Sequence, residues 1–472
     1  MTATAPRRDY SLDGEESVRA VERGLADGDW FHADIDPQRL RELSVRTNGR
    51  AAVDMAVWFG LAIGLGALAW SVRWTWWAVP AFLAYGAIVG GSSDARWHEC
   101  GHGTAFRTSW LNDLVYYPTS FMIARQATLW RWSHFRHHTD TIVVGRDPEI
   151  IFPRPPSLGQ AVLAFSNVKG GPMLMAGTVR HAFGRLDVST RILVPESDHR
   201  RVIWEARVYV AIWAAAVVWA LASWSIHPVL LIGGPTIYGA WLMVFFGITQ
   251  HAGLREDVLD HRRSTRTVYM NPVFRFLYLN MNYHVEHHMF PAVPYHRLPE
   301  LHAEIADQLP APLPSTAAAY REIFHAIRQQ HEDPTWELDR HVPDVPGTPG
   351  PIVQAFDWPA DGGVRVAAHL EPGESQAIDV AGRRLLLVRD TLGTLHAVDR
   401  ICTHGDADLA DGLVIGCEIE CPKHNGRFDL GTGAGTRRPI REPLTVHDVV
   451  ELDAGEVRVQ INSRSSASGA ST

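Results

Sequence analysis

The chain has 472 residues, of which 46% are hydrophobic and 20% are charged, and its formal net charge is -8 at pH 7. This acidic balance argues against a nucleic-acid-binding protein, because phosphates select basic surfaces. The length allows two or more domains, but the average composition does not separate a soluble protein from a membrane protein, because the apolar residues are concentrated in a few stretches.

Four apolar stretches follow a polar N-terminal segment, residues 1–50. Each is close to the roughly 20 residues that a helix needs to cross a bilayer. Very short connections join the stretches in pairs, and tryptophans gather at these connections, as is typical of the lipid headgroup level. We therefore predict four transmembrane helices in two hairpins, with buried core helices of a soluble protein as the alternative. The stretches are residues 52–70, 74–91, 208–226 and 229–248.

Arginines set the predicted orientation of these hairpins. The tips carry Arg73 alone, whereas several arginines precede the first stretch and several follow the second. Because basic loops tend to stay in the cytoplasm, both termini and the long segment 92–207 are expected on the cytoplasmic side. We expect a multi-pass protein of the cytoplasmic membrane. Its four cysteines would then stay reduced, which favours metal ligation over disulfides.

The remaining chain divides by composition. Residues 51–330 are expected to form the membrane domain, including a cytoplasmic helical cap after the fourth stretch. Residues 331–354 are rich in Pro and Asp without a period, which predicts a linker. Short alternating runs broken by glycine turns predict an all-β domain over 355–462, and 463–472 is predicted to be disordered. The expected fold class is multidomain: an α-helical transmembrane bundle with a helical cap, plus a C-terminal all-β domain.

Histidines dominate the predicted chemistry of the membrane domain. His98, Glu99 and His102 form the H-E-x-x-H pattern that a zinc protease presents on a helix. The chain supplies more imidazoles than one zinc needs, since a zinc site takes three or four protein ligands. Spacings of three and four residues place the members of each group on one helical face. Nine imidazoles can fill two metal sites, and imidazole with open positions suits iron and O2 chemistry. The candidate ligands are His98, His102, His134, His137, His138, His251, His284, His287 and His288.

These boxes resemble those of the membrane fatty acid desaturase and hydroxylase superfamily, over about residues 50–310. The resemblance covers an HxxxH box, two HxxHH boxes, a lone histidine after the last span and the "GRDPEI" that follows the second box. It implies that the nine histidines bind a di-iron centre at the cytoplasmic face and that the bundle leads an aliphatic chain to it. Glu99 is then expected to hydrogen-bond an imidazole rather than to act as a protease base. Gly247 departs from the Asn found in some desaturases, so no water-mediated ligand is carried over.

The C-terminal domain contains a second set of metal-ligand residues in two short loops. Cys402 and His404 lie in one loop and Cys421 and His424 in the other, which suits a [2Fe-2S] cluster, although zinc accepts the same residue types. Residues 363–460, notably "CTHGDADLADG" and "ECPKHNGRFDL", resemble the Rieske ferredoxins that serve aromatic-ring dioxygenases. The resemblance implies a low-potential electron carrier without the disulfide of high-potential relatives, because Asp406 and Pro422 or Lys423 stand in that neighbourhood. Cys417 lies outside the ligand pattern and is expected to be a small buried residue.

Together the two resemblances imply an O2-dependent membrane di-iron oxidoreductase that desaturates a fatty acyl or other lipid chain with electrons from its own Rieske domain. The alternative is a hydroxylase or monooxygenase of a lipid, a hydrocarbon or a smaller substrate. A membrane zinc protease and a non-catalytic metal-binding or transport protein are the remote alternatives. The chain has no flavin or nicotinamide motif, so we expect a separate NAD(P)H-dependent ferredoxin reductase as partner.

Overall fold

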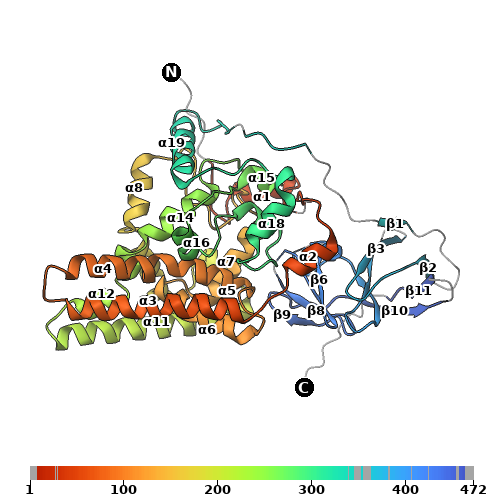
Figure 1. The fold of residues 1–472 in the computed structure, drawn as a ribbon, viewed down its shortest axis with the longest axis horizontal. Coiled ribbons are helices and arrows are strands. Elements are labelled where there is room, and N and C mark those ends of the chain that lie inside the picture. The colour runs from red at the N-terminus through yellow and green to blue at the C-terminus, as the bar shows by residue number, and fades with distance from the viewer. Residues whose placement is uncertain are drawn as a thin grey trace. The chain divides into compact units, whose positions relative to one another are not determined.

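The computed structural model describes residues 8–462 except 27, 29, 339, 345–351, 355–362, 381–382, 406, 424 and 453–455. The chain divides into two compact units, Met1–Met289 with Val293–Val345, and Phe290–Ala292 with Pro346–Thr472. Within the described residues the first unit is almost entirely helical and the second is built mainly of strands (Figure 1). The predicted disordered tail and parts of the predicted linker lie outside the described residues.

The two longest helices of the first unit are α3 (Gly49–Ser71) and α11 (Glu196–Ala222). Among the described residues, these two are long and apolar enough to cross a membrane by the criteria of length and composition. In each, 28% of the apolar window is buried within the protein. A core helix of a soluble protein would be hidden over most of its length, so the apolar surface of these two helices needs another apolar environment.

The second predicted span continues as one helical run with a π-helical segment inside it, whereas the fourth is interrupted. Helix α4 (Ala78–Gly86) passes into the π-helix η1 (Ala87–Ser92) and then into α5 (Ser93–His102). The fourth stretch is broken into α12 (His227–Leu231), α13 (Pro235–Tyr238) and α14 (Trp241–His251). The break falls at Gly233, whose φ of +87° is outside the helical region, and at Pro235, which lacks a backbone N–H. Four continuous spans are therefore not seen, and the four-span topology stays a prediction.

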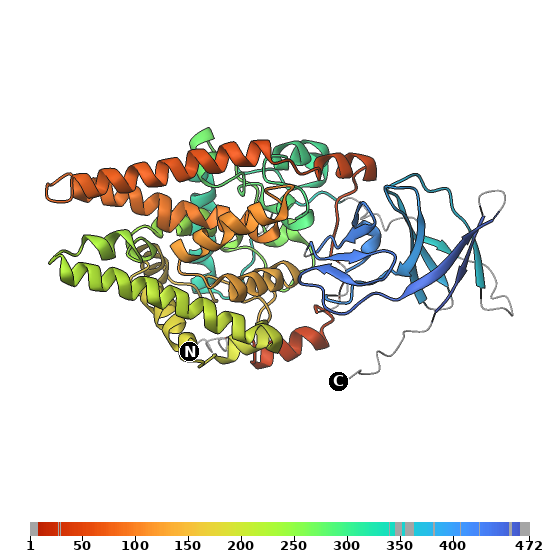
Figure 2. The same ribbon diagram turned by 90° about the horizontal axis from the view of Figure 1, so that it is seen from below.

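The helices of the two predicted hairpins lie side by side (Figures 1 and 2). Residues of α3, α4, α12 and α13 share one apolar cluster at the end of this bundle. The contact between α13 and the π-helix is close enough to require glycine: a Cβ atom on Gly90 would collide with the carbonyl of Pro235, and one on Gly239 with the carbonyl of Gly86. Small residues thus let the backbone of the broken fourth stretch pack against the helix that leads into α5.

The remaining helices surround and cap this bundle, as predicted for the region after the fourth stretch. Their ends follow ordinary capping chemistry; for example, Ser315 Oγ accepts from Ala318 N at the start of α19, and α5 ends at Gly103 with φ +69°. These helices are α1 (Glu15–Glu22), α2 (Pro37–Leu43), α6 (Ser109–Met122), α7 (Ala127–Thr139), α8 (Leu158–Ser166), α9 (Gly170–Ala182), α10 (Val188–Leu193), α15 (His261–Ser264), α16 (Pro272–Leu277), α17 (His284–Met289), α18 (Leu298–Ile305), η2 (Ala306–Gln308) and α19 (Thr316–Glu332).

The second unit contains two sheets, as the alternating sequence pattern predicts. The larger has the strand order β1-β3-β4-β5-β10-β11-β2 and is antiparallel except for the parallel pair β1 and β3; the smaller has the order β6-β7-β8-β9 and is antiparallel. Two apolar clusters form its core. Its elements are β1 (Ile352–Gln354), β2 (Gly363–Ala367), β3 (Ser375–Val380), β4 (Arg383–Arg389), β5 (Leu395–Asp399), η3 (Leu409–Asp411), β6 (Leu413–Ile415), β7 (Glu418–Glu420), β8 (Arg427–Asp429), β9 (Gly435–Arg437), β10 (Val446–Glu451) and β11 (Glu456–Gln460).

Candidate metal centres

The structure brings all nine candidate histidines of the helical unit into two neighbouring groups. They come from four helices, α5, α7, α14 and α17, which are far apart in the chain. Within each group the ligand atoms lie within 4.8 Å of one another. The first group is His98, His102, His134, His138 and His287, and the second is His137, His251, His284 and His288.

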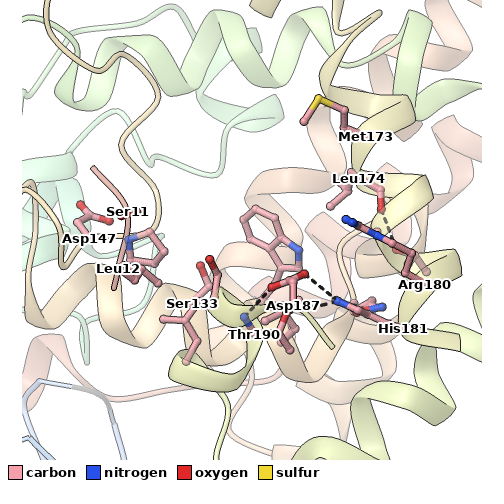
Figure 3. A pocket seen from close by; sticks show the side chains of 18 of the residues that line it. Ser11, Leu12, Ser133, Asp147, Met173, Leu174, Arg180, His181, Asp187 and Thr190 are labelled. Carbon is pink, nitrogen blue, oxygen red and sulfur yellow. Dashed lines mark hydrogen bonds and ion pairs between the residues drawn. The ribbon is translucent and has the colours of Figure 1, made fainter. Parts of the chain in front are cut away.

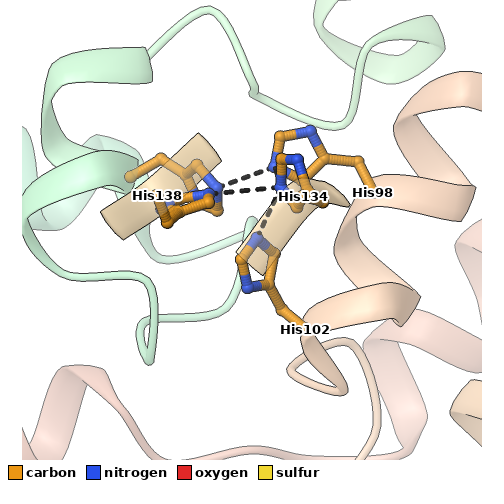
Figure 4. Close-up of side chains that lie close together, drawn as sticks. His98, His102, His134 and His138 are labelled. Atoms are coloured by element: carbon orange, nitrogen blue, oxygen red, sulfur yellow. Dashed lines mark hydrogen bonds between the residues drawn. The ribbon is translucent and has the colours of Figure 1, made fainter. Parts of the chain in front are cut away.

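The Nε2 atoms of the first group point at one another (Figure 4). His134 Nε2 lies 3.1 Å from that of His98, 3.0 Å from that of His102 and 3.2 Å from that of His138. His98 Nε2 also lies 2.7 Å from His287 Nε2. An imidazole ring nitrogen carries at most one proton, so several of them meeting at one point need a cation in common.

The second group has the same geometry. His284 Nε2 lies 3.0 Å from both His251 Nε2 and His288 Nε2. The rings of His138 and His288 are stacked with centroids 4.2 Å apart, so the two groups adjoin. A first-row metal with bonds of about 2.1 Å to imidazole holds adjacent ligand atoms of an octahedron about 3 Å apart. Groups of five and four neutral nitrogen donors therefore fit two such metals with coordination positions left open.

In both groups, some imidazoles are oriented by a hydrogen-bond partner on Nδ1, the ring nitrogen that points away from the other imidazoles of the group. Asp147 Oδ2 lies 2.8 Å from His137 Nδ1, and Glu149 Oε2 lies 3.4 Å from His134 Nδ1. The carbonyl of Ser264 accepts from His251 Nδ1 at 2.9 Å. A partner on Nδ1 fixes the tautomer and leaves the Nε2 lone pair for a metal. Sequence reasoning did not assign Asp147 and Glu149, although both lie in the "GRDPEI" segment that contributes to the resemblance.

Burial keeps most of these imidazoles neutral. Desolvation lowers their pKa values well below the usual value, and the charges of neighbouring imidazoles lower them further. His137 is different, because Asp147 raises the pKa of this imidazole by more than burial lowers it. The neutral imidazole is the form that binds a metal, so the group is prepared for ligation without loss of protons. The lowered pKa values are those of His98, His138, His251, His284, His287 and His288.

Glu99 does not make the contact expected of it within the described residues. Its Oε1 accepts from Thr104 Oγ1 at 2.7 Å and from the backbone N–H of Tyr295 at 3.2 Å, and neither partner is an imidazole. The reason is helical phase: His98 and His102 are four residues apart and share one face, whereas Glu99 is turned by about 100° from His98. Burial raises the pKa of Glu99 to about 7. Glu99 thus links α5 to the chain at Tyr295. The hydrogen bonds that orient histidines come instead from other carboxylates, namely Asp147 and Glu149.

A cavity of about 290 Å³ opens beside the histidines. His98, His134 and His137 form part of its wall together with His251 and His284. Much of the rest is apolar and includes Ile150, Ile151, Phe152, Met243, Val244 and Ile248. Gly247 also lines it, and a Cβ there would have Ile151 Cδ1 at 4.0 Å as its neighbour, so glycine keeps this part of the cavity wide.

A second cavity of about 350 Å³ adjoins the first, since Trp130, Pro148 and Ile150 line both. Figure 3 shows its polar side, where Asp187 and His181 point toward each other. His181 Nε2 lies 3.0 Å from Asp187 Oδ2, and its Nδ1 lies 2.7 Å from Gln126 Oε1. This hydrogen-bonded set holds α9 against the start of α10.

The two cysteines predicted as cluster ligands lie together in the second unit. Cys402 and Cys421 are both buried in the same core cluster. A hydrogen bond from the Cys421 thiol lowers the pKa of Cys402 despite the opposing effect of burial. A lowered pKa favours the thiolate, which is the ligand form. His404 follows in the turn after Cys402. The fourth predicted ligand, His424, lies outside the described residues, as does Asp406.

The two cysteine loops are shaped by their own backbone hydrogen bonds. Cys402 N donates to Ala407 O at 2.9 Å, and Cys421 N donates to Gly426 O at 2.8 Å. Lys423 Nζ donates to Gly405 O at 3.2 Å, which ties one loop to the other in the region where high-potential relatives have a disulfide. The expectation for Cys417 was wrong: this cysteine is exposed, because it stands in the turn between β6 and β7.

Comparison with known proteins identifies both units. The fatty acid desaturase family matches residues 74–318, which is just over half of the chain. The Rieske [2Fe-2S] domain family matches residues 363–448. The desaturase match contains all nine candidate histidine ligands, and the Rieske match contains both cysteine loops. The first match implies a di-iron centre in the histidine-rich site, and the second implies a [2Fe-2S] cluster rather than zinc.

Relatives of the C-terminal domain are ferredoxins. The ferredoxin component of the naphthalene 1,2-dioxygenase system of Pseudomonas aeruginosa is 39% identical over 94 residues, which are 20% of this chain and 88% of the relative. The anthranilate 1,2-dioxygenase ferredoxin subunit of Burkholderia cepacia is 34% identical over 105 residues, 22% of this chain and 93% of the relative. A solved structure, the ferredoxin of carbazole 1,9a-dioxygenase from Nocardioides aromaticivorans IC177, is 40% identical over 20% of this chain and 89% of its own, with a TM-score of 0.19.

The two matches do not overlap: the Rieske match falls within the second compact unit, and the desaturase match falls within the first except for residues 290–292. The protein is an oxidoreductase fusion that carries its own electron-transfer domain. With its three histidine boxes gathered in one place, the chain belongs to the fatty acid desaturase family and bears a C-terminal Rieske [2Fe-2S] domain.

Proposed function

We propose that this protein uses O2 to oxidise an unactivated C–H bond of a hydrophobic substrate in the cavity beside the histidines. The single observation that carries the proposal is the convergence of nine imidazoles, eight of them buried, in two groups beside a cavity that has both apolar and polar side chains in its wall. The nine histidines would hold the two irons, and Cys402, His404, Cys421 and His424 would hold the cluster. Introduction of a double bond into an aliphatic lipid chain is the primary form of the proposal.

Hydroxylation is the second form. Both reactions begin with removal of one hydrogen atom, and the outcome depends on how the substrate radical is held afterwards. The relatives of the Rieske domain favour keeping this alternative, because they are named as components of dioxygenase systems that act on naphthalene or anthranilate, compounds smaller than lipid chains.

Bound in the histidine groups, a pair of irons would supply the reductive activation of O2 that protein side chains cannot provide. The chain's own residues would supply position and environment. Asp147, Glu149 and the Ser264 carbonyl hold imidazoles with their Nε2 atoms turned inward. The apolar wall excludes water, which protects a reactive oxidant from unproductive reactions.

We also propose that the helical unit lies in the membrane with its histidine-bearing end and both termini in the cytoplasm. The support is the exposed apolar surface of α3 and α11 and the exposed tryptophans at the predicted hairpin tips, Trp74, Trp76, Trp77 and Trp224. The interrupted fourth stretch would then be a span whose non-helical backbone is buried against the helix that contains Gly90, as the close contacts at Gly90 and Gly239 allow.

A separate NAD(P)H-dependent reductase is the proposed electron source for the Rieske domain. Full-length protein should consume O2 and form product with NADH only after such a reductase is added. Turnover with NADH and purified protein alone would contradict this part of the proposal.

Metal analysis combined with product analysis tests the central proposal. We expect about four irons per chain, two of them in a cluster with a Rieske spectrum. Mass spectrometry of lipids from cells that express the protein with a reductase should show molecules altered by loss of two hydrogens or gain of one oxygen. A membrane zinc protease would instead hold zinc at His98 and His102, and a metal carrier would bind metal without O2 consumption.

A further inference from the structure

One ion pair stands in the wall of the metal cavity. Asp94 Oδ1 accepts from Arg125 Nη1 at 2.5 Å, and both residues line the cavity. The side chains are 15% and 17% exposed, so the pair is mostly removed from bulk water. Placing a charged pair in a wall that is mostly removed from bulk water is unfavourable for folding unless the pair has further hydrogen-bond partners. A wall of this kind is poorly suited to a plain hydrocarbon chain.

Arg125 is held rigidly. Its guanidinium packs against two indoles that are nearly perpendicular to each other, those of Trp97 and Trp130, with its carbon 4.4 Å and 4.5 Å from the two ring centroids. Its backbone N–H donates to Ser120 O, and its backbone carbonyl accepts from Tyr209 Oη. The preceding residue, Ala124, has a φ of +56°, a conformation that is unfavourable for a residue with a Cβ atom. Packing therefore fixes the direction of this guanidinium.

The guanidinium has hydrogen-bonding capacity beyond Asp94. Its Nη2 has Met243 Sδ at 3.7 Å, and a thioether sulfur is a weak acceptor. An arginine offers five N–H donors in a rigid fork, and a strong donor without a good acceptor in a buried wall is unfavourable. A ligand oxygen in the cavity would satisfy it.

The pair lies close to the histidines. Asp94 is one helical turn before His98 on α5, and the Trp97 ring that stacks on Arg125 is 5.5 Å from the His134 ring. A molecule that accepts a hydrogen bond from Arg125 therefore has its neighbouring carbon atoms beside the first histidine group. Fixing a substrate by a polar group near the reacting bond is an effective way to orient it.

Among its described residues the wall has three carboxylates and two arginines. Asp94 offsets Arg125, Arg154 lies 3.4 Å from Glu256, and Glu149 lies 3.4 Å from His134 Nδ1. A carboxylate ligand would bring a negative charge next to Asp94, whereas a neutral oxygen would meet a donor without this repulsion. We propose that the substrate is a hydrophobic molecule with a neutral oxygen, such as a ketone, an alcohol or an ether, that accepts a hydrogen bond from Arg125. The inference rests on the proposed function in assuming that the reaction takes place in this cavity.

Equilibrium binding of three probes to full-length, iron-loaded protein in lipid nanodiscs tests this inference, with partition into empty nanodiscs subtracted. The probes are dodecane, dodecan-2-one and dodecanoate. We expect the ketone to bind at least about ten-fold more tightly than the other two, the effect of one hydrogen bond to a charged donor. In Arg125→Met, which keeps a long apolar side chain against the indoles, the ketone should lose this advantage while dodecane binding stays the same.

Asp94→Asn gives a test based on a gain in binding, which misfolding would not produce. The amide can still accept from Arg125, but the wall loses a negative charge, so dodecanoate should bind about ten-fold more tightly than to the original protein. Asp113→Asn is the matched control, because Asp113 forms an exposed pair with Arg131 at 3.0 Å and does not line the cavity. This control should leave all three affinities unchanged.

Equal binding of the three probes, or no gain for dodecanoate in Asp94→Asn, would overturn the inference. Iron content and reductase-dependent O2 consumption are measured on the same preparations. Absence of both with the ketone preference intact would count against the proposed function alone, so the two failures are distinguishable.

Discussion

The two metal centres of this chain are built in opposite ways. The histidine centre draws its ligands from four helices spread over residues 98–288, and the helices meet only through tertiary packing. The cysteines of the Rieske site stand in two short loops, and each loop is closed by a backbone hydrogen bond within a few residues of its cysteine. The first site therefore forms only when the helical unit has folded, whereas the shape of each cysteine loop is determined by residues close to it in the sequence.

This difference has consequences for electrostatics and for folding. The imidazoles pack against one another and their Nε2 atoms lie about 3 Å apart. A metal held by these atoms would therefore add to the stability of the helical unit. The cysteine loops have hydrogen bonds that do not depend on the cluster. Substitutions should therefore affect the two centres separately. A single substitution that disables both centres would contradict this independence.

The largest effect is expected for His137→Ala. His137 belongs to the second histidine group and is the imidazole whose pKa Asp147 raises. Loss of a metal ligand should reduce product formation to background and lower the iron content, while the visible spectrum of the Rieske cluster stays unchanged. His199→Ala is the control, because His199 contacts the Val194 carbonyl and lies outside both groups. Loss of the Rieske spectrum in His137→Ala would indicate misfolding and would contradict the proposed independence.

His404→Ala should give the reverse pattern. Removing this proposed ligand should bleach the Rieske spectrum and abolish turnover driven by the reductase. Enzyme that has been reduced chemically should still complete a single turnover, because the histidine centre is intact. The exposed His369 of the same unit provides the control variant. If single turnover were lost as well, the cluster would be needed for more than electron supply.

Asp147→Asn is expected to act more moderately. The amide keeps the size of the carboxylate but loses its charge toward His137 Nδ1, so iron affinity or activity should fall by about 10–100-fold. Competition with a chelator measures the affinity. Asp140→Asn is the contrasting variant, since buried Asp140 pairs with Arg136 and Arg146 and with no imidazole. It should lower the melting temperature without changing iron affinity. Equal effects on iron in both variants would contradict an orienting role for Asp147.

The smallest effect is expected for Asp390→Asn in the second unit. Burial raises the pKa of Asp390, but hydrogen bonds from His396 and from the backbone N–H groups of Thr394 and Leu392 lower it by more. The carboxylate therefore stabilises the fold above its ordinary pKa of 3.8, and this contribution is lost as the pH falls through the lowered value. The variant should melt a few degrees lower at pH 7, and the difference should vanish at strongly acidic pH. Loss of cluster absorbance on heating reports the transition.

The gathering of the candidate histidines could be predicted because helical spacing and residue type are both visible in the sequence. Spacings of three and four residues placed His134, His137 and His138 on one face, and the structure has them on a single helix. The partners behind the ligands were harder to foresee, since Asp147 reaches His137 only after the chain turns at the end of α7. The same holds for the ion pair of Asp94 and Arg125, which depends on how the α6–α7 connection packs against α5.

The break in the fourth apolar stretch was not predicted. A mean over about 20 apolar residues does not register where a helix is interrupted, as this one is at Gly233, Gly234 and Pro235. The error about Glu99 had a related origin: adjacency in the sequence was taken as adjacency in space, although neighbouring residues of a helix face different directions. The all-β character of the C-terminal unit was easier to predict, because alternating strand residues and glycine turns are signals within a few neighbouring residues.

The π-helix between Ala87 and Ser92 determines the direction in which each side chain of the following helix, α5, points. A π-helix contains one residue more per turn than an α-helix, and each helical residue advances the side chain by about 100°. Deleting one residue there would swing His98 and His102 together out of the first group while leaving both histidines in the chain. The glycine contacts with α13 and α14 stop the helix from rotating back. The extra residue of the π-helix, although it contacts no candidate ligand, thus determines the direction in which two of the nine imidazoles point.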